Sequence, residues 1–110
     1  MFETRCIKVK LKPGSLLHVR AWADELKSRK VEALETMREE GMVVESTFLD
    51  STSEGDFLIC FMKAQSFEKA TGVVKQSLHA IDASHQTFKK DTTESVTQLE
   101  LLVDLDCMSQ

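Results

Sequence analysis

The stretch Asp56-Phe57-Leu58-Ile59-Cys60-Phe61-Met62-Lys63 is apolar at both odd and even positions. Because side chains alternate between the two faces of a strand, this pattern predicts a β-strand that is covered on both faces. One face carries Phe57, Ile59 and Phe61, and the other carries Leu58, Cys60 and Met62. A chain of 110 residues with two convincing helical stretches can cover one face of a small sheet. We therefore expect a second copy of the chain to cover the other face.

Upstream of this strand, the sequence predicts a first strand and a long helix. Residues from Arg5 to Leu11 alternate between apolar and polar, and Pro13-Gly14 follows as a turn. Ser15 is a suitable N-cap for a helix that we expect to run to about Glu40, where Gly41 provides a stop.

Downstream, the pattern predicts a hairpin, a second helix and a last strand. Met42 to Asp50 forms the strand that pairs with the central one through the polar turn between them. Ser66 caps the second helix, which either continues to Phe88 or breaks near Leu78-His79-Ala80 and restarts, since Asp82 is itself a good N-cap. Val96 to Asp104 is the predicted last strand.

The resulting order is βαββαβ, which is the ferredoxin-like α+β arrangement. We expect one domain over residues 1–110, with a four-stranded antiparallel sheet in the order 4-1-3-2 and two helices on one face. The open face is then too apolar to remain fully exposed to solvent. Two such faces packed together would form a homodimer, a dimeric α+β barrel. On that face we expect Leu58, Cys60, Met62 and Leu102.

Composition narrows the classes of function. Of the residues, 42% are hydrophobic and 29% charged, and the net charge of −4 opposes nucleic-acid binding, which needs a concentrated basic surface. No apolar run is long enough for a membrane span, and the N-terminal residues lack the pattern of a secretory signal, so we expect a cytoplasmic protein. The three cysteines lack metal-ligand spacing, and we expect neither a metal nor a cofactor.

The chain resembles a bacterial family of uncharacterised proteins of about this length, usually placed with the dimeric α+β barrels. The resemblance spans nearly the whole chain. It rests on Trp22, Leu26 and Arg29, on residues 45–49 and 58–62, and above all on the Ile-Asp-Ala-Ser-His-Gln-Thr-Phe motif of residues 81–88 ahead of residues 99–105. The family often has a Pro before the Ile-Asp pair, where this chain has Ala80. The resemblance implies the architecture and no particular chemistry.

The first candidate catalytic pair is Asp82 and His85. The two residues are three apart on a predicted helix, so a carboxylate could orient an imidazole for acid or base catalysis. The alternative is structural, because His85 also falls on the inner stripe of the helix, and Asp82 is suited to cap a turn.

Three further residues are candidates for ligand binding. Arg29 lies at the edge of the apolar stripe of the first helix, where its guanidinium group could clamp a carboxylate or merely reach solvent. Trp22 could stack on a flat substrate, although one Trp on a helical stripe is usually part of a core. Glu45 could supply a carboxylate inside the barrel. Lys8 and Lys10 could attract an anion or pair with Glu100 across neighbouring strands.

Function is therefore predicted only in outline. Relatives at the level of fold include haem-degrading and quinol-oxidising monooxygenases, small isomerases and ligand-sensing regulatory domains, and fold alone does not choose among them. We expect a small-molecule pocket between the paired sheets of an enzyme of the monooxygenase or isomerase kind. The alternatives are a non-catalytic ligand-sensing or protein-interaction module, and a structural dimer with no pocket.

Overall fold

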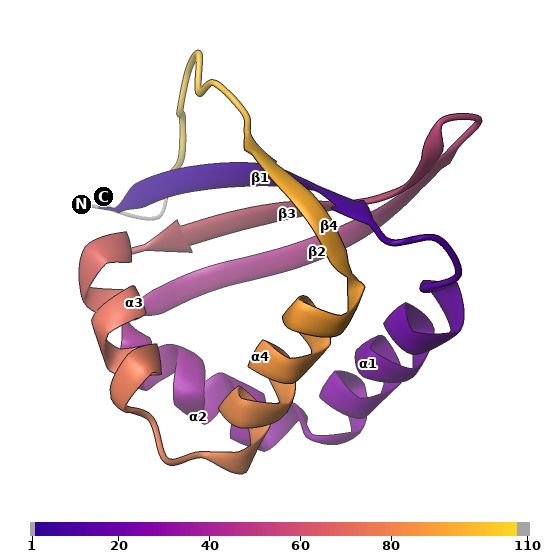
Figure 1. The fold of residues 1–110 in the computed structure, drawn as a ribbon. Coiled ribbons are helices and arrows are strands. Elements are labelled where there is room, and N and C mark those ends of the chain that lie inside the picture. Colours follow the sequence, from indigo (N-terminus) through magenta and orange to yellow (C-terminus); the bar gives the residue numbers. More distant parts are fainter. Residues whose placement is uncertain (1, 108–110) are drawn as a thin grey trace.

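A computed structural model describes residues 2–107. Its elements are, in order, β1 (Glu3–Leu11), α1 (Leu16–Ser28), α2 (Lys30–Glu40), β2 (Met42–Thr52), β3 (Gly55–Ala64), α3 (Phe67–Gln76), α4 (Ala80–Thr92) and β4 (Thr93–Gln98). The strands form one antiparallel sheet in the order β2-β3-β1-β4, and the helices lie on one side of it (Figure 1). This is the expected strand order, read from the opposite edge, and it confirms the ferredoxin-like α+β fold.

The register of the sheet decides which side chains meet the helices. Val9 pairs with Leu58 across β1 and β3, and paired residues in an antiparallel ladder share a face. Val9 and Leu58 both lie in the main core, and Cys60 and Met62 on the same face of β3 pack against buried residues. The expectation that Leu58, Cys60 and Met62 face outward is therefore wrong, because the ladder ties them to the helix side.

The open face of β3 carries the other set, Phe57, Ile59, Phe61 and Lys63. Beside them in the register lie residues of β1 and β2 on the same face, including Cys6 opposite Phe61 and Phe48 opposite Ile59. Phe48 is 62% exposed. The open face is thus more aromatic than we expected.

Two apolar clusters hold the helices to the sheet. The larger contains Val9, Leu11, Val19, Leu58 and Phe88, and Trp22 packs against it. The smaller contains Met42, Ala64, Phe67 and Ala70. The larger cluster fixes α1 and α4 beneath the sheet and so positions Trp22 between them.

There are four helices rather than two, because each predicted helix is interrupted. The first breaks at Arg29, whose φ of −110° and ψ of 33° leave the helical range. The carbonyl of Glu25 there accepts both from the Arg29 N–H and from the Ser28 hydroxyl. The second helix breaks after Gln76 and restarts at Ala80, with His79 rather than Asp82 in the N-cap position. Leu78 lies in this link and is 99% exposed.

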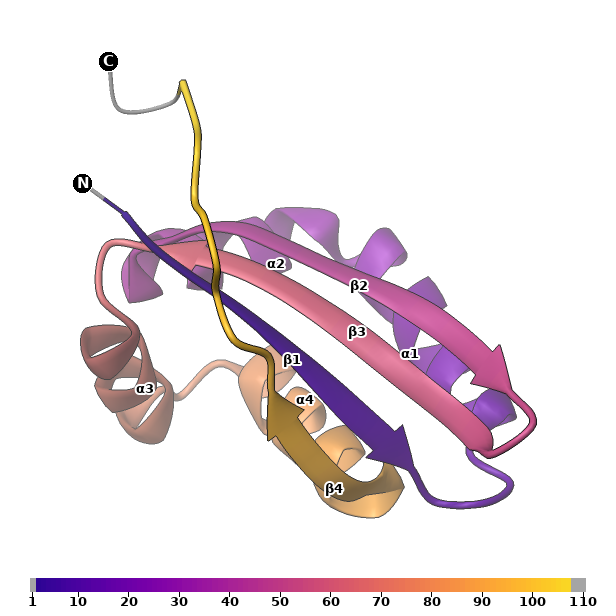
Figure 2. The ribbon, with the colours of Figure 1, turned by 90° about the horizontal axis from the view of Figure 1, so that it is seen from above.

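The last strand differs most from its prediction. It runs from Thr93 to Gln98 instead of from Val96 to Asp104. Residues 99–106 leave the sheet, and Figure 2 shows them passing over β1. Leu99 and Leu101, which fall within the predicted strand from Val96 to Asp104, are 41% and 55% exposed. Within residues 2–107, no helix is long and apolar enough to cross a membrane.

Candidate functional site

Trp22 on α1 and His85 on α4 form the polar contact at the centre of the helix layer. The indole Nε1 donates a hydrogen bond to His85 Nδ1 over 3.1 Å, and the two rings stack with centroids 5.6 Å apart. Phe88, one turn further along α4, stacks almost parallel on Trp22 at 4.4 Å. Because Nδ1 accepts this bond, the proton of the neutral imidazole is on Nε2. Burial lowers the pKa of His85 to about 4, so the ring is neutral at physiological pH and its Nε2–H is a hydrogen-bond donor.

The expected Asp82–His85 pair has a different arrangement. The carboxylate of Asp82 accepts a hydrogen bond from the hydroxyl of Ser77 at 2.5 Å, across the break between α3 and α4. His85 takes its orienting partner from Trp22. Asp82 therefore organises the start of α4 and acts on the imidazole only through its charge, which raises the pKa of His85 against the larger effect of burial.

Glu40, at the end of α2, has the most strongly perturbed pKa of the described carboxyl groups, and the charges of Asp82 and Lys89 act on it as they do on His85. It is 8% exposed, and burial, followed by repulsion from Glu45 and Asp82, raises its pKa to about 7. No described residue donates a hydrogen bond to its carboxyl group. Every fully enclosed side-chain nitrogen or oxygen in residues 2–107 has a partner, so the oxygens of Glu40 retain some contact with solvent. A group with this pKa exchanges protons readily near neutral pH.

Glu45 on β2 and Cys60 on β3 add to this region from the sheet face that packs against the helices. Both are on the helix side of their strands, since Glu45 pairs with Met62 and Cys60 with Ile7. Burial raises the pKa of both groups, although Glu45 keeps an exposed side chain. A hydrogen bond from Thr47 lowers the pKa of Cys60, and the positive charge of Lys89 on α4 lowers the pKa of Glu45, Cys60, Glu40 and His85. Groups from α2, α4, β2 and β3 are therefore all influenced by Lys89.

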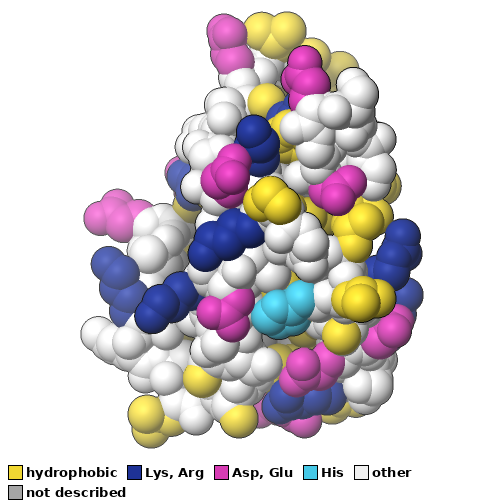
Figure 3. Space-filling view, turned by 45° about the vertical axis from the view of Figure 1, so that its right-hand side comes forward, with side chains coloured by type: hydrophobic (Ala, Val, Ile, Leu, Met, Phe, Trp, Pro, Cys, Tyr) yellow, Lys and Arg dark blue, Asp and Glu magenta, His cyan; other side chains and the backbone are white. Residues whose placement is uncertain are grey.

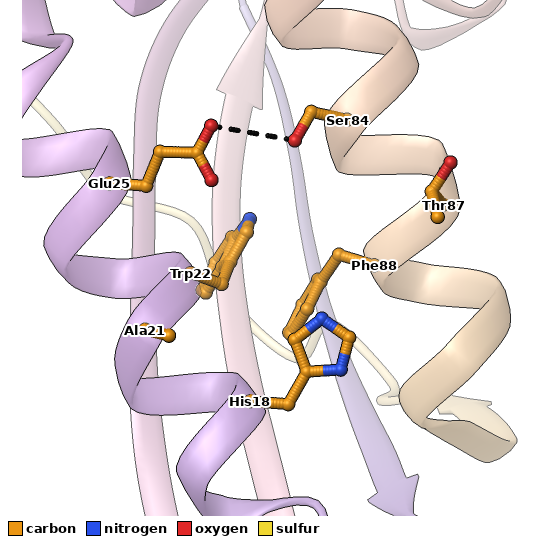
Figure 4. A pocket seen from close by; sticks show the side chains of 7 residues that line it. All are labelled: His18, Ala21, Trp22, Glu25, Ser84, Thr87 and Phe88. Carbon is orange, nitrogen blue, oxygen red and sulfur yellow. Dashed lines mark hydrogen bonds between the residues drawn. The ribbon is translucent and has the colours of Figure 1, made fainter.

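A groove lies next to this region, between α1 and α4 (Figure 4). It has a volume of about 360 Å³ and is lined by His18, Ala21, Trp22, Glu25, Ser84, Thr87 and Phe88. The rings of His18, Trp22 and Phe88 gather along it, and the carboxylate of Glu25 accepts a 3.5 Å hydrogen bond from Ser84 at one end. His85 does not line the groove. Trp22 connects the two, because its ring forms part of the groove and its Nε1 holds His85.

Arg29 has a structural role in this arrangement. Its guanidinium group spans the α1–α2 break and contacts Glu25 and Glu32 at 2.7 Å each. These hydrogen bonds raise the pKa of Arg29 and occupy the donors that a ligand carboxylate would need. On the open face, Lys8 lies 4.4 Å from the centre of the Phe57 ring, and Lys10 pairs with Glu94 rather than with Glu100.

The face of the molecule that includes α1 carries no concentrated charge that would define a ligand by itself (Figure 3). Figure 3 shows acidic, basic and hydrophobic side chains interspersed on the face that includes the α1 side of the molecule. Within residues 2–107, no three His, Cys, Asp or Glu side chains are grouped as a metal site would require. The groups with perturbed pKa values inside the fold are therefore the most specific chemical feature.

Sequence reasoning missed two members of this region, Glu40 and Lys89. A signal for Glu40 was available, because a carboxylate in the last turn of a helix opposes the helix dipole and is unfavourable unless something else retains it. Glu39-Glu40 just before Gly41 is such a case. Lys89 had no comparable signal, since a lysine on an exposed helix flank is ordinary.

Comparison with solved structures supports the fold. Rv0793 from Mycobacterium tuberculosis aligns with a TM-score of 0.57 at 17% identity, covering 96% of this chain and 100% of that one. PA3566 from Pseudomonas aeruginosa aligns with a TM-score of 0.56 at 13% identity, covering 91% and 93%. A Bacillus cereus protein named for a proposed monooxygenase role in antibiotic biosynthesis reaches a TM-score of 0.40 at 16% identity, too low for an argument.

Comparison of sequences gives a family and no activity. No curated protein matches the chain. Residues 2–110 match a family of unknown function (DUF6176). The match covers nearly the whole chain, and the chain therefore belongs to this family.

Proposed function

We propose that this protein is a cofactor-independent acid–base catalyst that moves a proton at a carbon next to a carbonyl group, as an isomerase does. The observation that carries the proposal is that a neutral imidazole and a buried carboxyl group whose pKa is about 7 are both influenced by the charges of Asp82 and Lys89. Such opposed shifts of neighbouring groups assign an acid and a base in many enzymes. The same first step, removal of a proton from carbon, also begins cofactor-free oxygenation.

The roles follow from the protonation states. Glu40 as carboxylate takes the proton from carbon, and the electrons of the broken C–H bond move to the carbonyl oxygen. His85 donates a hydrogen bond from its Nε2–H to that oxygen as negative charge develops there and keeps its proton, with Trp22 holding the tautomer. The electrons then return from the oxygen to carbon as Glu40 gives the proton back, either to the same carbon or to the far carbon of a conjugated C=C bond, which leaves the enzyme unchanged. Glu45 and Lys89 adjust the affinity of Glu40 for its proton.

We also propose that the protein is a bacterial cytoplasmic homodimer. Support for the dimer comes from the open sheet face, where Phe48 is 62% exposed, and from Leu102 and Leu105, which are 85% and 88% exposed. Soluble monomers rarely leave such a set of large apolar side chains in water. Support for the cytoplasm is weaker and comes from Cys6, Cys60 and Cys107, all of which are free thiols.

A ligand-sensing module is the second candidate function, and the α1–α4 groove favours it. The groove has a volume at the low end of ordinary ligand sites, and it combines aromatic rings with a carboxylate and two hydroxyl groups. In that case a ligand would bind against Trp22 and undergo no reaction.

Proton exchange in D₂O separates the two functions. Pyruvate, acetoacetate and dihydroxyacetone serve as probes, and proton NMR follows the loss of the signal from the carbon next to the carbonyl. The catalytic proposal expects exchange at least tenfold faster than in buffer alone, and loss of that acceleration in Glu40→Gln and His85→Phe. Glu94→Gln is the matched control, because Glu94 lies on β4 in an exposed pair with Lys10.

Each result has a defined meaning for these probes. Exchange that Glu40→Gln leaves unchanged would exclude Glu40 as the base. Binding of a probe without exchange, abolished by Trp22→Ala, would favour the sensing module. Exchange at the buffer rate with every probe would count against the proposed reaction for small carbonyl compounds.

A further inference from the structure

The groove between α1 and α4 opens on the helix side of the molecule. Ala21 on α1 and Thr87 on α4 line it and are exposed. Figure 1 shows both helices on the same side of the sheet, so a second copy packed on the open sheet face would leave the groove accessible. Its volume of about 360 Å³ is near the lower limit of ordinary small-molecule sites. The groove therefore fits a small ligand.

Two aromatic rings offer their edges to this ligand. Trp22 and Phe88 stack with centroids 4.4 Å apart and planes only 2° from parallel, and Figure 4 shows both rings edge-on. The edge of an aromatic ring carries partial positive charge and its face partial negative charge, so an edge attracts the face of another ring. His18 makes such a contact with Phe88 at 5.4 Å and 81°. A flat aromatic ring lying across the edges of Trp22 and Phe88 would make it again.

One end of the groove is anionic. Glu25 Oε1 accepts from Arg29 at 2.7 Å and from Ser84 at 3.5 Å, and within residues 2–107 no hydrogen bond reaches Glu25 Oε2. Arg29 is shared with Glu32, also at 2.7 Å, so one guanidinium group faces two carboxylates and the cluster has a net charge of −1. The side chain of Glu25 is 42% exposed. This end of the groove therefore favours a cation.

The distance between the two features limits the shape of the ligand. Glu25 follows Trp22 by three residues on one helix, which corresponds to a rise of about 5 Å. A ring over Trp22 and an ammonium group at Glu25 would be joined by two or three single bonds. The hydroxyl groups of Ser84 and Thr87 stand on the opposite wall and are further acceptors for ammonium protons (Figure 4).

We propose that the α1–α4 groove binds a small aromatic compound that carries an ammonium group on a short chain. The aromatic ring lies across the edges of Trp22 and Phe88, and the ammonium group contacts the carboxylate of Glu25. The proposal rests on the second candidate function, the ligand-sensing module, and names the class of its ligand. It does not depend on proton transfer at Glu40.

Titration with 2-phenylethylamine at pH 7 tests this site. Trp22 is the only Trp of the chain, so its fluorescence and its indole N–H signal in NMR report binding at the groove. We expect a dissociation constant on the order of 1 mM, as befits a ligand with one ring. Three comparison compounds should bind at least fivefold more weakly: 2-phenylethanol lacks the charge, 3-phenylpropanoate reverses it, and n-hexylamine lacks the ring.

A charge variant tests the carboxylate. Glu25→Gln should weaken binding of 2-phenylethylamine at least fivefold and change binding of 2-phenylethanol less than twofold, because only the amine uses the charge. The unchanged alcohol would show that the groove itself is intact. Asp24→Asn is the matched control, since Asp24 is an exposed neighbour that pairs with Lys27 at 4.0 Å and does not line the groove.

A second variant tests the location. Ala21→Leu should fill the groove and abolish binding of both 2-phenylethylamine and 2-phenylethanol. Ala83→Leu, at an exposed alanine of α4 outside the groove lining, should leave both unchanged. Binding that neither Glu25→Gln nor Ala21→Leu weakens would overturn the proposal, as would equal affinity for 2-phenylethylamine and 3-phenylpropanoate. No change of either Trp22 signal at about 10 mM amine would also overturn it, without bearing on the D₂O exchange test of Glu40.

Discussion

The hydrogen bond from Trp22 to His85 Nδ1 determines what the imidazole can do. A ring whose Nδ1 accepts and whose pKa is about 4 offers a proton on Nε2 and does not act as a base at neutral pH. The base must then come from a carboxyl group, and Glu40 has the pKa suited to that role. Sequence alone placed His85 on an inner stripe, but it assigned the orienting partner to Asp82. A tertiary contact between residues 63 positions apart could not be inferred from spacing within one helix.

At Glu40, we expect Glu40→Gln to stabilise the protein above neutral pH. A carboxyl group whose pKa is raised from 4.5 to about 7 holds its proton more tightly in the folded state. The folded state then binds more protons than the unfolded state between these values, so the unfolding free energy of the wild type falls as pH rises from about 4.5 to 7. Removing the charge should raise the unfolding free energy at pH 8 by on the order of 2–3 kcal/mol, with little change at pH 4.5.

Urea unfolding of both proteins across this pH range measures the effect. Glu94→Gln should show no such pH-dependent gain, because Glu94 is exposed and paired with Lys10. Parallel stability curves for wild type and Glu40→Gln would mean that Glu40 has an ordinary pKa in the folded protein.

At Trp22, we expect Trp22→Phe to preserve an aromatic contact with Phe88 and to remove the donor to His85. The lost hydrogen bond should lower the unfolding free energy by about 1 kcal/mol. The pKa of His85 should rise, because the Nδ1 lone pair becomes free to accept a proton. NMR titration of the imidazole reports this shift, and His18→Phe is the control, since His18 touches Phe88 only through a ring edge. An unchanged His85 titration would show that the Trp22 bond does not influence the ring.

At the scale of elements, the first three strands were predictable, the helix break near His79 was one of two alternatives, and the break at Arg29 was not foreseen. Apolar patterning located these three strands and the hairpin, because it is a local property of the chain. No Pro or Gly marks the break at Arg29. The contacts found there, from the Ser28 hydroxyl to the Glu25 carbonyl and from Arg29 to Glu25 and Glu32, are not visible in a pattern of apolar residues. The last strand was overextended because residues 99–105 carry a strand-like pattern that finds no partner strand within the chain.

Gly41, which ends α2, provides a prediction at this scale. Its φ of 75° is left-handed, and a Cβ there would lie 3.2 Å from Gln65 Oε1. Gly41→Ala should therefore lower the unfolding free energy by about 1–2 kcal/mol. Gly72→Ala, within α3 where a Cβ would meet nothing within 4 Å, should be neutral or stabilising by up to about 1 kcal/mol. Thermal unfolding of the two variants measures both changes. Equal changes in unfolding free energy would contradict the conclusion that the left-handed conformation of Gly41 ends α2.

At the scale of the whole molecule, the two faces of the sheet should respond differently to a charge. Leu58→Asp would place a carboxylate in the main core, where Leu58 is 5% exposed, and should unfold the protein at a cost of several kcal/mol. Phe48→Asp lies on the open face and should leave a folded protein that dimerises less. Circular dichroism together with light scattering separates the outcomes. A folded, monomeric Leu58→Asp protein would restore the sequence-based assignment of the faces.

The sequence predicted the fold, including the strand order and the existence of one open sheet face. These features follow from local patterns and from general rules for how strands and helices are connected. It did not predict which side of β3 is open, since a strand that is apolar on both faces contains no preference until its register with β1 is known. Of the site, Trp22, His85, Asp82 and Glu45 were identified as candidates. Glu40 and Lys89 join them only through tertiary proximity.

The most direct test of the central claim is an NMR titration of the Glu40 carboxyl carbon and the His85 ring nitrogens in the wild-type protein. The account predicts that Glu40 titrates near pH 7, that His85 titrates near pH 4, and that the neutral ring of His85 carries its proton on Nε2. Ordinary titration of both groups, with Glu40 near 4.5 and His85 near 6.5, would contradict it.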